Sequence, residues 1–339
     1  MPVFGSLLEL ERRPLQTHHG RFEGVRFLDL ARGKIAWVLA RGDVWSPAPV
    51  LARVHSACLT SEVFGACDCD CADQLAAALA AIDREGRGLL FYLMQEGRGA
   101  GFVAKARDRM MVQASDERIH TFEAYERMGL PHDARSYREV AFALEALGVA
   151  APLHVLTNNP DKVVGLEGAK IRIAGTRGLP PRVSPFNRHY LAAKSASGHS
   201  LGAPARGLRA PLPEAVVWTE GRLLADVPNV AHVASYLLPL RPTGADLDPP
   251  VWYRCHVYFD LVRGAERVVL ELASGNGPRA VLRQTLTDRF PLTEPGPEAA
   301  AWRAHRAAIE AHGGGRALFL DPGETRVPSH APALLARSV

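Results

Sequence analysis

The sequence of 339 residues contains no run of 18 apolar residues, so no segment is predicted to cross a membrane as a helix. Its first residues, Met-Pro-Val-Phe-Gly-Ser, lack the charged and apolar regions of a signal peptide. The five cysteines are odd in number and crowd at Cys-x-Cys-x-Cys spacing, which argues against a disulfide framework. We therefore expect a cytoplasmic protein with reduced thiols and no membrane association.

Features of nucleic-acid-binding proteins are also scarce. The formal net charge is only +4, and the basic residues are dispersed along the chain. No platform of aromatic and basic residues occurs, and no zinc-finger spacing. A nucleic-acid-binding zinc protein is therefore disfavoured, and we expect no nucleic-acid partner. The apolar fraction of 47% and the charged fraction of 22% are normal for a folded soluble protein.

Four of the five cysteines lie between residues 53 and 74, and a chance scatter would not place them so close together. They are Cys58, Cys67, Cys69 and Cys71. Thiolates brought together by a tight loop suit zinc, which binds sulfur and usually takes four ligands. Three protein ligands and an open water position would make a catalytic site, whereas a fourth thiolate would make a structural one. The residues alone leave both arrangements open.

Local patterns predict a mixed α/β fold. Apolar runs with strand spacing are found at 21–27, 34–40, 50–56, 89–94 and 153–156. Helical composition and spacing are found at 74–82, 102–113 and 138–147. A short helix, turn and strand is expected over 166–173, and 187–201 closes this region. The repeated order of strand, polar loop and helix indicates a domain whose loops at the strand ends carry the chemistry.

The chain is long enough for two domains, and its composition marks a boundary. Residues 202–213 are rich in proline and glycine and are predicted to be a linker. We assign 1–201 to the first domain and 214–339 to a second, smaller α+β domain. Its predicted strands are 215–218, 251–261, 268–272 and 316–320, and its predicted helices are 278–290 and 298–312.

Two loops of the first region have residues suited to phosphate binding. Gln95-Glu96-Gly97-Arg98-Gly99 follows a strand, and its glycines would let backbone amides approach a phosphate while the arginine supplies a bidentate fork. A plain turn explains this loop equally well. Thr157-Asn158-Asn159-Pro160 follows another strand, and by itself it indicates a helix cap.

Four motifs follow one another along the chain: Arg-Val-His-Ser-x-Cys-Leu-Thr, Cys-x-Cys followed by Gln, Gln-Glu-Gly-Arg, and Leu-Thr-Asn-Asn-Pro-x-Lys. Together, these motifs resemble GTP cyclohydrolase II. The resemblance runs from about residue 14 to residue 201, more than half of the chain. It implies an enzyme of riboflavin biosynthesis that opens the imidazole ring of GTP and releases formate and pyrophosphate. It also implies one catalytic zinc ion, magnesium with the triphosphate, and a homodimer.

The same resemblance implies the site residues. The family's ligand spacing places the zinc ligands at Cys58, Cys69 and Cys71 and leaves Cys67 outside. The positions that match nucleotide contacts are Arg53, Val54, His55, Ser56, Ala57, Gln74, Glu96, Gly97, Arg98, Thr121, Thr157 and Lys162. Gln74 would read guanine, since an amide offers a base edge both a donor and an acceptor.

Asp133 and Arg135 match the family's catalytic pair. There the arginine is proposed as the nucleophile on the α-phosphorus and the aspartate as its proton acceptor. Arginine is almost always protonated, so it is a poor nucleophile unless a nearby base withdraws a proton. Asp133 could do so, or could simply pair with Arg135.

Three positions depart from the family pattern. The family's tyrosine in the helix after the glycine-rich loop falls at Arg109, or at Met110 with a one-residue shift, and neither has a hydroxyl. Ala57 stands where glutamate is common, and Asp68 where a basic residue is common. We therefore expect pyrophosphate release and ring opening without efficient formate release. Two alternatives are a cyclohydrolase that acts on another purine nucleotide and a nucleotide-binding regulator that has lost catalysis.

Overall fold

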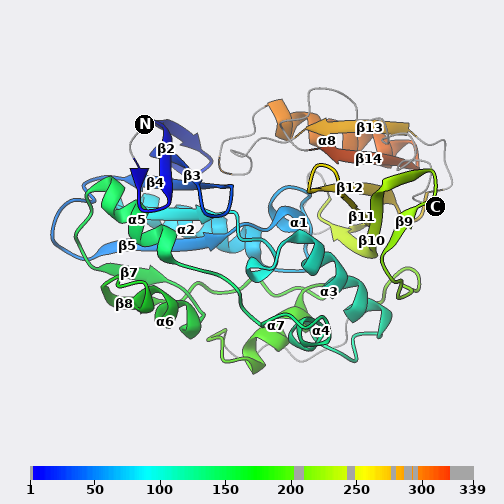
Figure 1. The fold of residues 1–339 in the computed structure, drawn as a ribbon, viewed down its shortest axis with the longest axis horizontal. Helices are drawn as coiled ribbons and strands as arrows, with labels where there is room; N and C mark the ends of the chain where they lie inside the picture. The colour runs from blue at the N-terminus through cyan, green and yellow to red at the C-terminus, as the bar shows by residue number, and fades with distance from the viewer. Residues whose placement is uncertain are drawn as a thin grey trace.

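Two β-sheets and the helices around them make up the described part of the protein (Figure 1). The computed structural model describes residues 3–201, 210–242, 249–275, 280–285, 292 and 297–320. The first sheet has eight strands and the second six, which confirms the predicted mixed α/β class. Within these ranges, no helix is long and apolar enough to span a membrane.

The first sheet combines an antiparallel half with a parallel half, and its strand order is β1-β2-β3-β4-β6-β5-β7-β8. The strands are β1 Val3–Phe4, β2 Leu7–Thr17, β3 Gly20–Asp29, β4 Lys34–Arg41, β5 Val50–Ser56, β6 Gly88–Leu93, β7 Leu153–Leu156 and β8 Ile173–Arg177. The neighbours β6, β5, β7 and β8 pair in parallel. Their C-terminal ends therefore meet at one edge, where open α/β sheets bind ligands.

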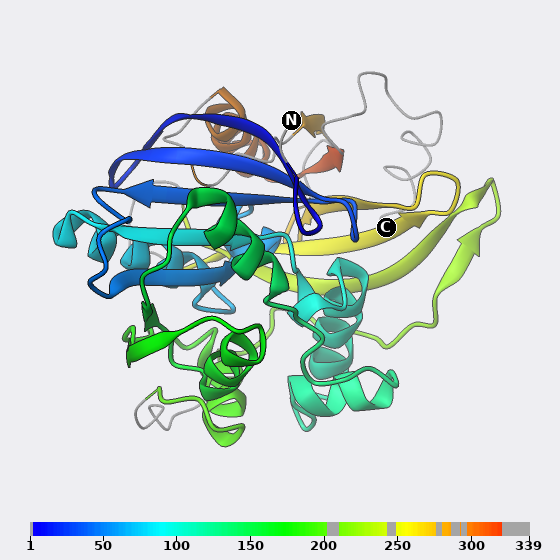
Figure 2. The same cartoon turned by 60° about the vertical axis from the view of Figure 1, so that its left-hand side comes forward.

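Helices cover both faces of this sheet. They are α1 Leu59–Glu62, α2 Cys71–Glu85, the 3-10 turn η1 Gly97–Gly99, α3 Phe102–Ala114, α4 Thr121–Arg127, α5 Arg138–Leu147, α6 Pro160–Gly168 and α7 Arg188–Ala196. Strand alternation divides the core, because Val38 packs with α5 on one face and Trp37 packs with α2 on the other. In Figure 2, α3 and α4 (teal) and α6 and α7 (green) lie below the strands.

The second sheet has the strand order β13-β14-β12-β11-β10-β9. Its strands are β9 Arg222–Leu224, β10 Val227–Leu240, β11 Val251–Asp260, β12 Ala265–Leu272, β13 Ala280–Thr285 and β14 Gly315–Leu320. Only β13 and β14 pair in parallel, and helix α8 (Pro297–Ala311) lies between them in the chain. This crossover is the usual way to join parallel neighbours.

The second sheet shares a core with α1 and α3. Phe102, Ala106 and Met110 of α3 are buried in one apolar cluster with residues of β10, β11, β12 and β14. The side chain of Gln113 exchanges two hydrogen bonds with the backbone of Leu237, at 2.7 and 2.8 Å. Helix α3 thus packs on the second sheet with one face, which leaves the other face for the first region.

Strand β10, which contains Leu237, also holds the cysteine-rich loop. Ala66 forms an antiparallel bridge with Leu240. On either side of it, the amide of Cys67 donates to Pro239 and that of Arg241 donates to Gly65, both at 2.9 Å. The loop is therefore fixed by backbone hydrogen bonds to β10.

Several sequence predictions need correction. The run 215–218 is not a strand, and Arg107 lies over the Trp218 ring there, 4.6 Å from its centroid. The helix predicted over 278–290 is wrong where it is described, because 280–285 is strand β13, which pairs with β14. Strand β2 was not predicted over most of its length. Most of the predicted linker, 202–209, lies outside the described residues, as do 278–279 and 286–290.

Candidate active site

Three cysteine sulfurs meet where β5 ends and α2 begins. Cys58 follows β5, Cys71 opens α2, and Cys69 lies in the loop before it. Their sulfur atoms lie within 4.8 Å of one another, and those of Cys58 and Cys69 are 3.7 Å apart. Tetrahedral zinc with sulfur at about 2.3 Å requires sulfurs about 3.8 Å apart. The donor set and its spacing therefore fit zinc.

Lys105 of α3 adds positive charge to this cluster. Its Nζ is 3.0 Å from the Cys58 sulfur and 2.8 Å from Oε1 of Glu96. Hydrogen bonds from Cys69 and Cys71, with the charge of Lys105, hold the pKa of the Cys58 thiol well below its ordinary value. The interaction with Cys58 raises the pKa of the Cys69 thiol. Thiolate character, which metal binding requires, is thus greatest at Cys58.

Cys67 is oriented away from the other three. Its buried sulfur donates to the carbonyl oxygen of Pro239 at 3.3 Å. Burial raises the pKa of this thiol to about 12. In the part of the chain that the structure describes, the one group of three or more metal-ligating side chains is Cys58, Cys69 and Cys71. This arrangement supports three sulfur ligands rather than four.

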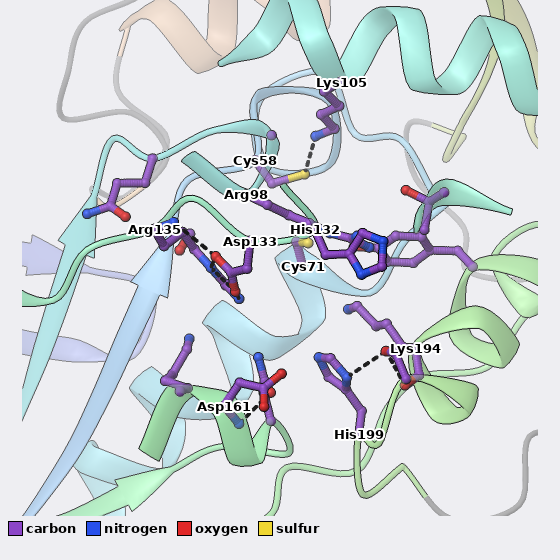
Figure 3. A pocket seen from close by; sticks show the side chains of 18 of the residues that line it. Cys58, Cys71, Arg98, Lys105, His132, Asp133, Arg135, Asp161, Lys194 and His199 are labelled. Atoms are coloured by element: carbon purple, nitrogen blue, oxygen red, sulfur yellow. Dashed lines mark hydrogen bonds and ion pairs between the residues drawn. The ribbon is translucent and has the colours of Figure 1, made fainter. Parts of the chain in front are cut away.

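A pocket of about 240 Å³ lies beside the sulfurs, where β5, β6 and β7 end. Seven lysines and arginines line it, against four carboxylates, and this excess of positive charge suits a polyanion. Figure 3 shows Cys58 and Lys105 at one end and Asp161 at the other. We call the group Cys58, Cys69, Cys71 and Lys105 the sulfur end. We call the group Arg98, Arg135, Lys162 and Lys194 the basic wall.

A hydrogen-bonded chain joins β5 to α7 across the pocket. Arg53 donates to the side-chain oxygen of Gln74 at 2.6 Å, and Gln74 donates to Asp70. Asp70 also accepts from Lys194 of α7 at 2.9 Å. Arg53 is buried, and its other hydrogen bond is to the carbonyl of Leu156 at 2.9 Å. The predicted guanine-reading residue, Gln74, is therefore held in place from both sides.

The glycine-rich loop brings Glu96, Gly97 and Arg98, which were assigned to nucleotide binding from the sequence, to the pocket. Glu96 accepts from the amide of Leu59 at 2.6 Å, in addition to Lys105. Arg98 has a left-handed backbone with φ of 55°, a strained conformation for a residue with a side chain. Its guanidinium lies 3.9 Å from the centroid of the Phe122 ring, so aromatic packing stabilises it there.

Thr157 lies in the loop after β7, and Lys162 lies in the first turn of α6. Asn159 caps α6 by accepting from the amide of Asp161 at 3.0 Å, which confirms the cap suggested by the sequence. Lys162 is buried and donates to the carbonyl of Val54 at 2.7 Å. Burial, and then the charges of Arg53 and Arg135, hold the pKa of Lys162 well below its ordinary value. A bound anion would therefore stabilise the protonated form of this lysine.

Asp133 and Arg135 form a bidentate ion pair on one wall of the pocket (Figure 3). Although burial alone would raise it, the hydrogen bonds from Arg135 hold the pKa of Asp133 below its usual range. The same pair raises the pKa of Arg135. Gly99 lets the glycine-rich loop approach this segment, since a Cβ there would lie 2.7 Å from the backbone of Ala134.

The segment after Arg53 faces two directions because strand side chains alternate. The side chain of Val54 packs in the core and does not line the pocket. His55 does, but its Nε2 is 2.6 Å from Glu62 and its ring stacks on Tyr92. Ser56 and Ala57 line the pocket, and Thr121 does so while donating to Asp108 at 2.9 Å.

Other lining residues were not among the predicted site residues. The charged and aromatic ones are Lys105, Asp108, Arg109, Phe122, Tyr125, His132, Asp161, Tyr190, Lys194 and His199. Tyr190 and Lys194 stand four residues apart, which places them on one face of α7. That spacing was the available signal, but the sequence alone did not show which element the face would meet.

Comparison with known proteins decides the family. A sequence model of GTP cyclohydrolase II matches residues 9–178. The chain belongs to the GTP cyclohydrolase II family. The matched residues include the cysteine-rich loop, the glycine-rich loop and the loop after β7, which confirms the resemblance seen in the sequence. The match ends before β9, the first strand of the second sheet.

Individual family members are similar over the same region. GTP cyclohydrolase-2 of Azotobacter vinelandii is 44% identical over 203 residues, 60% of this chain and 96% of the relative. GTP cyclohydrolase-2 of Pseudomonas putida strain W619 is 44% identical over 194 residues, 57% and 93%. Riboflavin biosynthesis protein RibBA of Bacillus cytotoxicus is 43% identical over 188 residues, 55% and 46%. The matched part thus spans about half the length of the RibBA relative.

Proposed function

We propose that this protein is a zinc-dependent hydrolase of GTP that opens the imidazole ring at C8 and releases pyrophosphate, in riboflavin biosynthesis. The observation that carries the proposal is the group of three cysteine sulfurs at one end of a pocket rich in lysine and arginine. Zinc held by Cys58, Cys69 and Cys71 would supply Lewis acidity for hydrolysis at C8. Family membership supports the same reaction.

The basic wall would bind the triphosphate. Arg98 and Arg135 bring two fixed positive charges to the pocket, and Lys162 adds a buried lysine whose protonated form a phosphate would stabilise. Guanidinium groups pair with phosphate oxygens in two parallel hydrogen bonds, and a buried lysine acts as a point charge. Magnesium would accompany the triphosphate. Glu96, the predicted carboxylate near it, already accepts from Lys105 and Leu59, so the phosphate oxygens would be the main magnesium ligands.

Gln74 would read the guanine base. Its amide accepts from Arg53 and donates to Asp70, which fixes its orientation. A side-chain amide has two acceptor sites and two donors, so one of each is left for a base edge. This pairing would favour guanine, but another purine nucleotide with the same edge would also fit.

The pair Asp133–Arg135 would act at the α-phosphorus. The carboxylate already accepts from the guanidinium, so it is placed to take a proton from it. The raised pKa of Arg135 means that the free protein holds this arginine protonated. Attack by Arg135 therefore requires that the proton pass to Asp133 when the nucleotide is bound.

We further propose that formate is not released efficiently. On α3, the family's tyrosine falls at Arg109, which lines the pocket, or with a one-residue shift at Met110, which is buried, and neither offers a hydroxyl. The product would then be the ring-opened nucleotide that retains its formyl group. We also propose a cytoplasmic homodimer in which 1–201 is the catalytic domain, 202–213 a linker and 214–339 a second domain.

The test is product analysis with the full-length protein. GTP is incubated with the zinc-loaded protein and with chelated protein, and pyrophosphate, formate and the nucleotide product are measured by mass spectrometry. We expect zinc-dependent pyrophosphate and a formyl-containing product. Stoichiometric formate would overturn formyl retention. GTP binding without pyrophosphate release would instead support the regulator.

A further inference from the structure

Arg109 lines the pocket and lies near Cys69 of the sulfur end. It follows Lys105 by four residues on α3, so the two side chains leave the same face of the helix. Lys105 reaches the sulfur of Cys58. Arg109 instead pairs with Asp68, the residue directly before Cys69, with Nε and Oδ2 3.3 Å apart. Both cations thus lie near the cysteine cluster, Lys105 at Cys58 and Arg109 beside the residue before Cys69.

Its surroundings hold the Arg109 guanidinium in one place. The side chains of Arg109 and Asp68 are only 11% and 10% exposed. The guanidinium carbon lies 4.8 Å from the centroid of the Tyr190 ring, and Nζ of Lys194 lies 4.5 Å from the same centroid. A side chain packed on a ring and tied to a carboxylate loses little freedom when it binds a ligand.

The guanidinium still has hydrogen-bonding capacity. Its Nε lies 3.3 Å from Oδ2 of Asp68 without hydrogen-bond geometry, so Asp68 occupies that side of the guanidinium. The side chain of Arg109 also lines the pocket. An acceptor on a ligand there would bind its terminal NH₂ groups in a charge-assisted hydrogen bond.

The purine offers such an acceptor. N7 of guanine is adjacent to C8, and it gains negative charge when a nucleophile adds to C8. An arginine fork commonly binds N7 together with O6. If the nucleotide lies with C8 toward the three cysteines, N7 faces the cations near them. Gln74, on α2, is left for another edge of the base.

We infer that Arg109 is a specificity-determining residue that donates to N7 of the purine and orients the imidazole ring toward Cys58, Cys69 and Cys71. Asp68 and Tyr190 are positioning residues that hold it. This inference rests on the proposed function, because it assumes that a purine nucleotide occupies the pocket. Asp68 and Arg109, which both depart from the family pattern, would then serve the same role, since one holds the guanidinium of the other in place.

The test compares GTP with 7-deaza-GTP, in which a C–H group replaces N7. Equilibrium binding to the full-length protein is measured in excess chelator, so that neither nucleotide is turned over, and by competition in the zinc-loaded protein. Loss of a charged hydrogen bond should weaken binding of 7-deaza-GTP on the order of 10- to 100-fold. This measurement on the unaltered protein needs no variant to fold.

Variants then assign the discrimination to Arg109. The double variant Asp68→Asn/Arg109→Met removes both charges together and should bind the two nucleotides equally, with little change for 7-deaza-GTP. Arg107→Met is the matched control, since Arg107 lies on the same helix but donates to Val233 of β10, at 2.9 Å. The Arg107→Met variant should keep the full ratio of affinities for GTP and 7-deaza-GTP.

Three results would count against the inference. A ratio near one in the unaltered protein, or an unchanged ratio in the double variant, would overturn it while leaving the proposed function intact. Failure of GTP itself to bind would overturn the proposed function and this inference with it.

Discussion

Lys105 and Lys162 are two buried lysines of one pocket, yet their surroundings shift their pKa in opposite directions. Burial alone would lower the pKa of Lys105, but Cys58 and Glu96 raise it well above its ordinary value. Burial, Arg53 and Arg135 lower the pKa of Lys162. The sulfur end is balanced by its own anions, and in the basic wall Arg135 and Lys194 are paired with Asp133 and Asp70, whereas Lys162 is buried and repelled by Arg53 and Arg135. That repulsion is relieved by a bound polyanion, so it marks where phosphates would bind.

The largest effect is expected when one cysteine sulfur of the sulfur end is removed. Cys58→Ser should abolish stoichiometric zinc binding and lower turnover on the order of 10³-fold or more, because the thiolate with the lowest pKa is lost. Zinc content by metal analysis checks this. Cys67→Ser is the matched control and should keep zinc, since Cys67 donates to Pro239. Loss of zinc from both variants would indicate four ligands.

Substitution of Arg135 tests whether this residue of the basic wall only binds the nucleotide or also attacks the α-phosphorus. Arg135→Lys keeps the charge but removes the two-pronged contact with Asp133. If Arg135 attacks the α-phosphorus, pyrophosphate release should fall about 100-fold or more, with GTP affinity changed less than about 10-fold. Single-turnover kinetics and binding separate the two. A parallel loss of rate and affinity would assign Arg135 to binding alone.

Substitution of Arg98 tests whether the positive charge of the basic wall contributes to GTP binding. Arg98→Ala should weaken GTP binding about 10- to 100-fold through a lost charge-assisted contact, and the effect should shrink as salt is raised. Zinc content should not change, because Arg98 is not among the three residues that could hold the metal. Arg127→Ala on the neighbouring helix α4 is the control, since Arg127 is exposed and pairs with Glu123. Equal losses of GTP affinity in Arg98→Ala and Arg127→Ala would contradict specific phosphate binding by the basic wall.

The smallest expected effect is a change in the titration of His199. Burial, Lys194, Arg98, Arg135 and Lys162 lower the pKa of this histidine to about 4. A bound triphosphate offsets those charges, so the pKa of His199 should rise. Binding then takes up a proton, and affinity should increase as the pH falls between the raised value and about 4. NMR titration with His199→Gln for assignment measures this. An unchanged pKa would place the phosphates elsewhere.

The sequence indicated a metal site at the three cysteines of the sulfur end because Cys58, Cys69 and Cys71 lie within one strand-to-helix connection. The choice of three ligands over four came from the family resemblance, and Lys105, which follows Cys71 by 34 positions, was not predicted. The loops after β6 and β7 were also predictable, because parallel strands end at one edge. Val54 was assigned to the nucleotide through the family motif, although strand alternation turns its side chain into the core.

What could not be predicted depends on contacts between distant segments. Tyr190 and Lys194 reach the pocket only because α7 returns beside α4 and the cysteine-rich loop. The second sheet was the weakest prediction: residues 280–285 have helix-forming composition, but pairing with β14 makes them a strand. The pairing of Asp68 with Arg109 could not be seen either, because the two lie 41 positions apart in the sequence.

The claim that the sulfur end serves hydrolysis depends on an open fourth position. X-ray absorption spectroscopy of the zinc-loaded, full-length protein counts the ligands directly. The arrangement of Cys58, Cys69 and Cys71 predicts three sulfurs at about 2.3 Å and one oxygen or nitrogen atom at about 2.0 Å. Four sulfurs would contradict it, because a closed site has no place for water and would make the zinc structural.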